Sequence, residues 1–397
     1  MARERCASMQ RSELIRGRSP EAMADDPNVP NRAGQAATSE VSEMKEALLY
    51  SRLSDGRVRC ALCEHRCMIA PGVRGRCGVR ENRQGTLVSL VYGRLVAQSV
   101  DPIEKKPLFH LLPGTLSYSI ATVGCNFTCQ FCQNHDISQW PRAHASDLES
   151  LGIPSAGGAE QTPPALVEAA LEAGCETIAY TYTEPTINME FVLDTARDAR
   201  DAGLRNVLVS NGFMTPEAIE LAAPWIDGIN IDLKSVSNDF YRHVVGGDVR
   251  PVLHAIEQFL REDVWVEVTT LLIPGLNDSE DQLRWTAEAV AGISASIPWH
   301  VSRFFPAYRM QRHPVTPRAT LERALAIGRD VGLKYVYVGN LPGGFEDTHC
   351  PECDALLLKR CGFVLEQSRL IDGACPECGT DLDGVWFAGT KIGKIDA

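Results

Sequence analysis

From about residue 117 onward, short apolar runs alternate along the chain with longer amphipathic stretches. Runs of β-branched and aromatic residues bounded by Gly, Pro or Asn are typical of buried strands, whereas apolar positions with a period near 3.6 are typical of helices. This pattern predicts strands at 117–125, 177–183, 206–210, 228–233, 264–273, 299–305 and 335–338. It predicts helices between them, at 164–173, 187–202, 216–223, 249–261, 279–293 and 318–331.

The repeated order of strand, loop and helix predicts an α/β fold, with a full or partial (β/α) barrel of parallel strands. In such a barrel, reactive side chains collect at the carboxyl ends of the strands. Those ends carry Cys125, Thr183, Glu184, Ser210, Asn211, Asp232, Lys234, Arg303 and Tyr308. Turn formation explains the nearby Pro and Gly residues but not the converging charges. Arg303 and Tyr308 are candidates for a substrate pocket that closes the rim opposite Cys125, with ordinary packing as the alternative.

The pattern divides the chain into four parts. Residues 1–43 have no apolar period and are expected to be a disordered tail. Residues 44–112 form an N-terminal Cys-rich module, 113–345 the barrel core, and 346–397 a C-terminal zinc-ribbon-like module. Met44 opens the first patterned segment and is a candidate start of translation.

Composition narrows the functional classes. The chain has 397 residues, 44% of them hydrophobic, and a formal net charge of -12. This charge argues against nucleic acid as a partner, because phosphate contacts need a clustered excess of Lys and Arg. No stretch approaches the roughly 20 apolar residues that span a bilayer, and the N-terminus lacks the apolar segment of a signal peptide. We therefore expect a cytoplasmic protein with no membrane association.

Cysteine usage is the strongest chemical signal. The chain has 14 cysteines, and cytosolic thiols seldom form structural disulfides, so metal or redox chemistry is expected. Most of them fall into three groups: Cys60, Cys63, Cys67 and Cys77; Cys125, Cys129 and Cys132; and Cys350, Cys353, Cys361, Cys375 and Cys378. Cys6 and Cys175 stand alone and are expected to be a tail residue and a small buried side chain.

Cys125, Cys129 and Cys132 follow the first predicted strand directly. Structural zinc prefers a closed set of four ligands, and iron–sulfur cubanes usually take four cysteines. Three thiolates without a nearby fourth leave one iron open to a chelating ligand, such as the amino and carboxylate groups of a methionine-like cofactor. A zinc knuckle or three incidental buried thiols remain the alternatives.

The C-x3-C-x2-C spacing, with Phe131 before the last cysteine, resembles the cluster motif of the radical S-adenosylmethionine superfamily. The resemblance implies a 4Fe-4S cluster, bound S-adenosylmethionine and an electron donor such as flavodoxin or ferredoxin. It also implies roles for the remaining rim residues: Phe131 packs near the adenine, Thr183 and Glu184 contact the cofactor amino group, and Ser210, Asn211 and Asp232 face its ribose and carboxylate, with the aspartate helping to hold a monovalent cation. The chain departs from the family pattern, because Tyr182-Thr183-Glu184-Pro185 stands where two glycines and a glutamate are usual.

Residues 44–390 resemble the AmmeMemoRadiSam system radical S-adenosylmethionine enzymes, a branch related to pyruvate formate-lyase activating enzymes. The resemblance is carried by 60–67, 75–80, 101–110, the triad and the C-terminal cysteine pairs. It implies an enzyme that forms a 5'-deoxyadenosyl radical and abstracts hydrogen from an unidentified protein or small-molecule substrate. Activation of a glycyl radical enzyme competes with modification of another substrate. The alternative class is a non-catalytic metal-binding or interaction protein on the same fold.

The two flanking cysteine groups suggest further metal sites. Cys350, Cys353, Cys375 and Cys378 form two CxxC pairs with zinc-ribbon spacing, so a structural zinc is expected there, and free thiols or an auxiliary cluster are the alternatives. Cys361 is expected to be a bystander. Cys60, Cys63, Cys67 and Cys77 suit either an iron–sulfur cluster or zinc, with His65 as a spare ligand and simple thiol packing as the alternative.

Two features near residue 105 remain open. The charge run 101–106 is interpreted either as a solvated loop or as part of a substrate site. His110 is either a structural group or a catalyst, since the pKa of histidine permits both.

Overall fold

The computed structural model describes residues 44–143, 161–341, 343 and 345–387, and the elements below belong to the unit Lys45–Ala397. The tail expected at 1–43, with Cys6, and the last residues of the C-terminal module lie outside the described residues. Within the described part, no helix is long and apolar enough to cross a membrane.

The central element is an eight-stranded sheet. Its strands are β6 (Ala97–Pro102), β7 (Leu116–Ala121), β8 (Thr177–Tyr180), β9 (Arg205–Ser210), β10 (Gly228–Asp232), β11 (Trp265–Leu272), β12 (Trp299–Arg303) and β13 (Val336–Gly339). Their order in the sheet follows the chain, β7 to β13 are parallel, and β6 pairs with β7 in the antiparallel sense. In the described part β6 and β13 form the two edges, so the predicted α/β fold is confirmed as a partial barrel.

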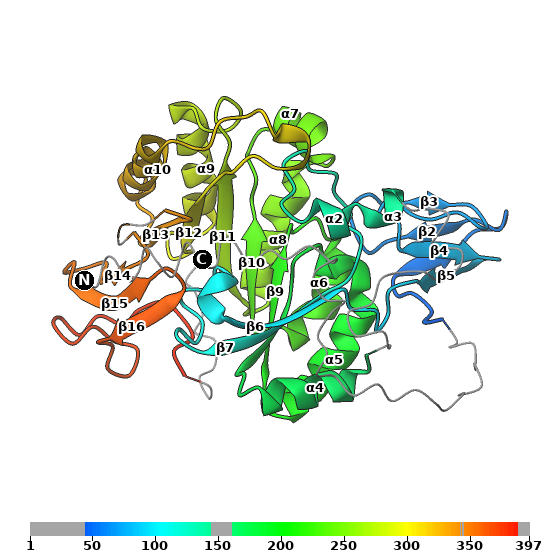
Figure 1. Ribbon diagram of the computed structural model, residues 1–397, viewed down its shortest axis with the longest axis horizontal. Coiled ribbons are helices and arrows are strands. Elements are labelled where there is room, and N and C mark those ends of the chain that lie inside the picture. Colours follow the sequence, from blue (N-terminus) through cyan, green and yellow to red (C-terminus); the bar gives the residue numbers. More distant parts are fainter. Residues whose placement is uncertain (1–43, 144–160, 342, 344, 388–397) are drawn as a thin grey trace, which may run out of the picture. The chain divides into compact units, whose positions relative to one another are not determined.

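Helices follow the strands and cover one face of the sheet (Figure 1). They are α4 (Pro163–Glu172), α5 (Met189–Asp201), α6 (Pro216–Ala222), α8 (Val249–Arg261), α9 (Glu280–Ile293) and α10 (Arg318–Asp330). Side chains of Thr162, Thr215 and Ser279 accept backbone hydrogen bonds at the N-termini of α4, α6 and α9, which fixes where these helices begin. The predicted strand and helix positions are thus confirmed to within a few residues.

The other face of the sheet is filled by the segment that follows β6. The Glu267 carboxylate on β11 accepts hydrogen bonds from the backbone N–H groups of Phe109 (3.0 Å) and His110 (2.8 Å). Asn230 on β10 donates to the carbonyl of Pro107 at 2.9 Å. The segment therefore closes the interior of the partial barrel, a role that the sequence did not predict.

The charge run 101–106 is not a solvated loop, contrary to one of its two interpretations. Asp101 and Lys106 are only 4% and 2% exposed, and the Lys106 ammonium contacts the Asp101 carboxylate at 2.6 Å. Lys105 bonds to the same carboxylate at 2.7 Å. A carboxylate with two ammonium partners can be buried because its charge is compensated.

His110 has a structural environment. Its Nδ1 lies 2.7 Å from the carbonyl oxygen of Asp383 and its Nε2 lies 2.6 Å from the hydroxyl of Tyr337. Burial lowers the pKa of His110 to about 4. The imidazole is therefore neutral at pH 7 and joins the interior segment to the C-terminal module.

Small sheets flank the central one (Figure 1). The N-terminal part has an antiparallel sheet of β1 (Tyr50–Arg52), β2 (Val58–Cys60) and β3 (Met68–Ile69), and a hairpin of β4 (Arg80–Arg83) and β5 (Thr86–Ser89). The C-terminal part has β14 (Thr348–His349), β15 (Leu356–Cys361) and β16 (Val364–Ser368). Arg360 on β15 donates to the carbonyl of Phe109 at 2.7 Å, which ties this part to the barrel interior.

Candidate cluster and cofactor site

The three central cysteines lie in the loop between β7 and the short helix α2 (His135–Ser138). Cys125 and Cys129 are buried, and Cys132 is half-buried. Gly124, directly before the triad, has a φ of 95°. A Cβ atom there would lie 2.9 Å from the carbonyl oxygen of Cys77, so only glycine lets the loop approach the N-terminal module this closely.

A π-helical turn, Tyr241–Val245, holds the other side of the triad loop. The backbone N–H groups of Thr128 and Gln130 donate to the carbonyls of Val245 and Val244 at 2.9 and 3.0 Å. Gly247 follows this turn, and a Cβ there would lie 2.4 Å from the ring of Phe127. The loop is thus fixed by backbone contacts on both sides before any metal is considered.

The surroundings of the thiols suit metal ligation. The Cys125 sulfur accepts from the N–H of Phe127 at 3.4 Å and from the Asn211 amide at 3.8 Å. Burial raises the pKa of Cys125 well above its usual range and that of Cys129 to about 12. A metal must therefore displace protons from these thiols, as thiolate ligation requires.

The donor set of the triad fits an iron–sulfur cluster. Cysteine thiolates are the ligands of such clusters, and N–H groups that point at sulfur tune them. In the part of the chain that the structure describes, the three triad sulfurs do not lie close enough to one another to bind a single ion. A cluster takes one iron per thiolate, so its ligand sulfurs need not converge on one point as those of a zinc site must.

Glu184, at the end of β8, connects several predicted cofactor residues. Its Oε1 accepts hydrogen bonds from the N–H of Thr186 at 3.0 Å and from the hydroxyl of Ser210 at 2.8 Å, and the Thr186 hydroxyl also donates to it. Its Oε2 accepts the N–H of Asn211 at 2.8 Å. Burial raises the pKa of Glu184, although these donors act in the opposite direction.

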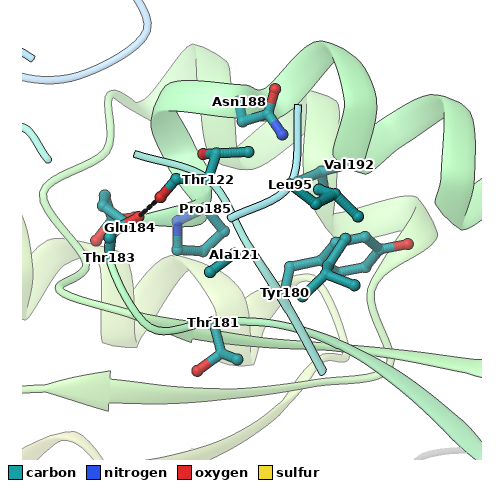
Figure 2. Close-up of a pocket in the computed structure, with 11 residues that line it drawn as sticks. Leu95, Ala121, Thr122, Tyr180, Thr181, Thr183, Glu184, Pro185, Asn188 and Val192 are labelled. Atoms are coloured by element: carbon teal, nitrogen blue, oxygen red, sulfur yellow. Dashed lines mark hydrogen bonds between the residues drawn. The ribbon is translucent and has the colours of Figure 1, made fainter. Parts of the chain in front are cut away.

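Figure 2 shows a narrow hollow behind this carboxylate, between the ends of β7 and β8. The Thr183 hydroxyl donates to the carbonyl of Thr122 at 2.8 Å and joins the two strand ends. Asn188 also lines the hollow, and its Oδ1 is buried without a hydrogen-bond partner. The ends of β7 and β8 are therefore linked directly behind the site.

Asn126 is a site residue that the sequence analysis missed. Its Oδ1 accepts from the amide of Asn211 at 2.7 Å, and its Nδ2 is buried without a partner. A buried amide with a free donor next to a triad thiol is suited to bind a polar ligand atom. Its position immediately after Cys125 was the only signal in the sequence.

Lys234 lies next to two of the predicted cofactor residues, Asp232 and Phe131. The Lys234 ammonium lies 3.0 Å from the Asp232 carboxylate and 5.6 Å from the centre of the Phe131 ring. Burial lowers the pKa of Lys234, but Asp232 and Cys129 outweigh this effect and raise it above its usual value. A lysine ammonium thus supplies positive charge beside Asp232, where the resemblance implied a bound cation.

Arg142 is a second missed residue. Its guanidinium donates to the carbonyls of Cys125 at 2.8 Å and of Phe127 at 3.3 Å. It also donates to the carbonyl of Arg76 in the N-terminal module, which it therefore joins to the triad loop. No sequence pattern distinguished this arginine from a surface residue.

The two substrate-pocket candidates lie differently from the expectation. Tyr308 stacks on His135 with ring centroids 4.8 Å apart, so it lies beside the triad loop rather than opposite it. Arg303 donates to the carbonyl of Thr316 at 2.9 Å. This bond gives Arg303 a packing role in the loop after β12.

The C-terminal cysteines form a compact group. The sulfurs of Cys350, Cys353, Cys375 and Cys378 all lie within 4.8 Å of one another, and Cys361 is not part of the group. The Cys350–Cys378 and Cys353–Cys375 sulfur distances are 3.6 and 3.7 Å. Four thiols at this spacing fit a single tetrahedral ion.

The chain is similar to several known proteins. The family model described as the radical SAM superfamily matches residues 119–284. The chain is 41% identical over 347 residues to an uncharacterized protein of Methanocaldococcus jannaschii, covering 86% of this chain and 99% of that protein. It is 25% identical over 169 residues to a GTP 3',8-cyclase of Rhodopseudomonas palustris, covering 41% of this chain and 46% of the cyclase. A solved domain of a pyruvate-formate lyase-activating enzyme from Bacteroides vulgatus is similar with a TM-score of 0.35 and 19% identity, covering 41% of this chain and 98% of that domain.

Proposed function

Because this chain belongs to the radical SAM superfamily of enzymes, we propose that Cys125, Cys129 and Cys132 hold a 4Fe-4S cluster with one iron left for S-adenosylmethionine. Together the cluster and S-adenosylmethionine supply a 5'-deoxyadenosyl radical, which abstracts hydrogen from a protein or small-molecule substrate. The observation that carries this proposal is the triad itself, with Cys125 and Cys129 buried, fixed at the carboxyl end of β7 and surrounded by Glu184, Asn211 and Lys234.

Each residue around the triad has a separate role in the proposed binding of the cofactor. Glu184 orients Ser210 and Asn211 through its two oxygens. Its Oε2 accepts one donor from the described residues, so a lone pair remains for the cofactor ammonium. The free Nδ2 of Asn126 is a donor for the cofactor carboxylate. Thr183 is held by Thr122 and keeps this end of β8 in place.

Burial and charge prepare the site for a polar ligand. Cys125, Asn126 and Glu184 are each less than a tenth exposed, so bulk water is excluded around them. Hydrogen bonds formed in such an environment are stronger than they are in water. The Asp232–Lys234 pair places both signs of charge next to Phe131, the proposed adenine contact.

The finer assignment is to the AmmeMemoRadiSam branch, supported by the cysteine stretches 60–67 and 75–80 and by the run 101–110. In this proposal the electron donor is a flavodoxin or a ferredoxin. The substrate is a protein, including a glycyl radical enzyme, or a small molecule. The C-terminal four-cysteine group holds a structural zinc, for which its single-ion spacing is the support.

The cofactor site is tested by spectroscopy of the anaerobically reconstituted full chain. After reduction with dithionite, addition of S-adenosylmethionine is expected to change the electron paramagnetic resonance spectrum of the cluster, because the cofactor binds the open iron. Replacing Asn126 with Ala is expected to weaken this response at limiting cofactor. A spectrum that saturating S-adenosylmethionine leaves unchanged would favour the non-catalytic alternative.

A further inference from the structure

The four N-terminal cysteines surround a common hollow. Cys60 ends β2, Cys67 precedes β3, and the N–H of Cys60 donates to the carbonyl of Cys67 at 3.0 Å. Cys63 pairs with Met214 in an antiparallel bridge. These three side chains and Cys77 line one hollow with about 330 Å³ of empty space, counting the space at its open side.

The spacing of these thiols differs from that of the C-terminal group. The sulfurs of Cys350, Cys353, Cys375 and Cys378 lie within 4.8 Å of one another, at the reach of a single ion. Among the residues that the structure describes, the N-terminal four do not form such a group, although all of them face the same hollow. The chain thus has two different four-cysteine groups. The C-terminal sulfurs converge on one point, whereas the N-terminal cysteines line a hollow.

A buried guanidinium lines the same hollow. Arg80 is 2% exposed, and its Nη2 donates to the carbonyl of Leu48 and to Glu190, both at 2.7 Å. Its Nε and Nη1 are buried without a hydrogen-bond partner. Buried donors of a charged group are almost always satisfied, so two guanidinium nitrogens without a partner beside four thiols indicate an acceptor that belongs there.

The geometry points to a second iron–sulfur cluster of the 4Fe-4S type, held by Cys60, Cys63, Cys67 and Cys77, with Arg80 as its buried positive partner. Four thiolates complete the ligand set of such a cluster and leave no open iron. Its sulfide and thiolate sulfurs supply the acceptors that the Arg80 N–H groups lack. A single zinc ion would bring no sulfides and would require the four sulfurs to converge.

This second cluster lies against the triad loop. Ile187 lines the hollow, and its side chain lies 3.1 Å from the point that a Cβ atom at Gly124 would occupy. His65, between Cys63 and Cys67, contacts the carbonyl of Asn126 at 2.8 Å through Nε2. His65 therefore links the two cysteine groups. Because the four cysteines complete the ligand set, His65 is not required as a metal ligand.

The second cluster is tested in a full chain from which the triad has been removed. The variant with Cys125, Cys129 and Cys132 all changed to Ala is reconstituted anaerobically, and iron, sulfide and zinc are measured per chain. We expect about four iron and about four sulfide to remain, with a cluster absorption that dithionite bleaches. Adding Cys60→Ala and Cys63→Ala is expected to remove both, whereas adding Cys175→Ala is expected to leave them unchanged.

Several outcomes overturn the assignment. A second zinc per chain in place of iron, beyond the one at the C-terminal group, would show a single-ion site. No iron, together with only the C-terminal zinc, would show thiol packing. Neither result bears on the triad, so failure here is distinguishable from failure of the proposed function.

The role of Arg80 is tested by the reduction potential of the same cluster. Arg80→Met removes a positive charge and N–H donors next to the cluster, so the potential is expected to fall. Arg80→Lys, which keeps the charge, is expected to lower it less and serves if Arg80→Met does not fold. Arg83→Met, on the same hairpin but exposed, is the matched control. An unchanged potential in a folded Arg80 variant would refute this role.

Discussion

Replacing Glu184 with Gln tests the proposed cofactor site at its most connected residue. Oε1 of Glu184 accepts from Thr186 and Ser210, and Oε2 accepts from Asn211. Glutamine has only one oxygen, so its NH2 group must face a donor whichever way the amide is turned. The orientation that keeps the bonds to Thr186 and Ser210 places NH2 where Asn211 and the cofactor ammonium donate.

The size of the effect follows from the lost contact. A hydrogen bond to a charged group contributes about 1.5 to 3 kcal/mol, so the affinity for S-adenosylmethionine should fall by roughly one to two orders of magnitude. The cluster itself should still assemble, since Glu184 does not ligate it. Anaerobic equilibrium binding gives the dissociation constant, and iron content verifies assembly.

Glu176→Gln is the matched control, because Glu176 is exposed and precedes β8 at its other end. It should bind the cofactor as the wild type does. If Glu184→Gln binds S-adenosylmethionine with wild-type affinity and a full cluster, Glu184 serves only to hold Ser210 and Asn211, and the binding role is wrong.

Three further predictions concern stability and metal content. Lys106→Met should lower the free energy of unfolding by about 3 kcal/mol, because Asp101 then loses its buried ammonium partner and keeps only the exposed Lys105 as a cation, beside the hydroxyls of Ser99 and Tyr182; urea unfolding measures this. His110 binds a proton below about pH 6.5 in the unfolded chain but only below about pH 4 in the native state, so it contributes a fall in stability of about 3 kcal/mol between these values. Burial lowers the pKa of His65 to about 4 as well, so His110→Gln should reduce the slope of stability against pH without abolishing it; equal slopes for the wild type and the variant would refute this. Cys353→Ser with Cys378→Ser should lose about one zinc per chain and lower the melting temperature, and unchanged zinc would contradict the closed site.

Local pattern was enough to predict the parallel part of the sheet. The runs at β8 to β13 are short and rich in β-branched residues, and capping residues such as Thr215 and Ser279 mark the helices between them. β6 was missed, because its sequence Ala97–Pro102 mixes polar and apolar residues and carries Asp101 near its end, whose charge is buried only because Lys106 pairs with it.

The candidate site was predictable where the chemistry is local. The spacing of Cys125, Cys129 and Cys132 was enough to predict cluster ligands, since one loop supplies all three. The functions of Arg80 and Asn126 depend on residues more than 80 positions away, Glu190 and Asn211, so no window of sequence contains them. Tertiary contact, not residue type, distinguishes this arginine from others in the chain.

The central claim is that the triad cluster cleaves S-adenosylmethionine. It is tested most directly by measuring 5'-deoxyadenosine after anaerobic incubation of the reconstituted full chain with dithionite and S-adenosylmethionine. The wild type and Cys175→Ala should both form it, and single Ala variants at Cys125, Cys129 or Cys132 should form none, because each leaves a second iron without a protein ligand. Formation of 5'-deoxyadenosine at the wild-type rate by any of these three variants would contradict the account.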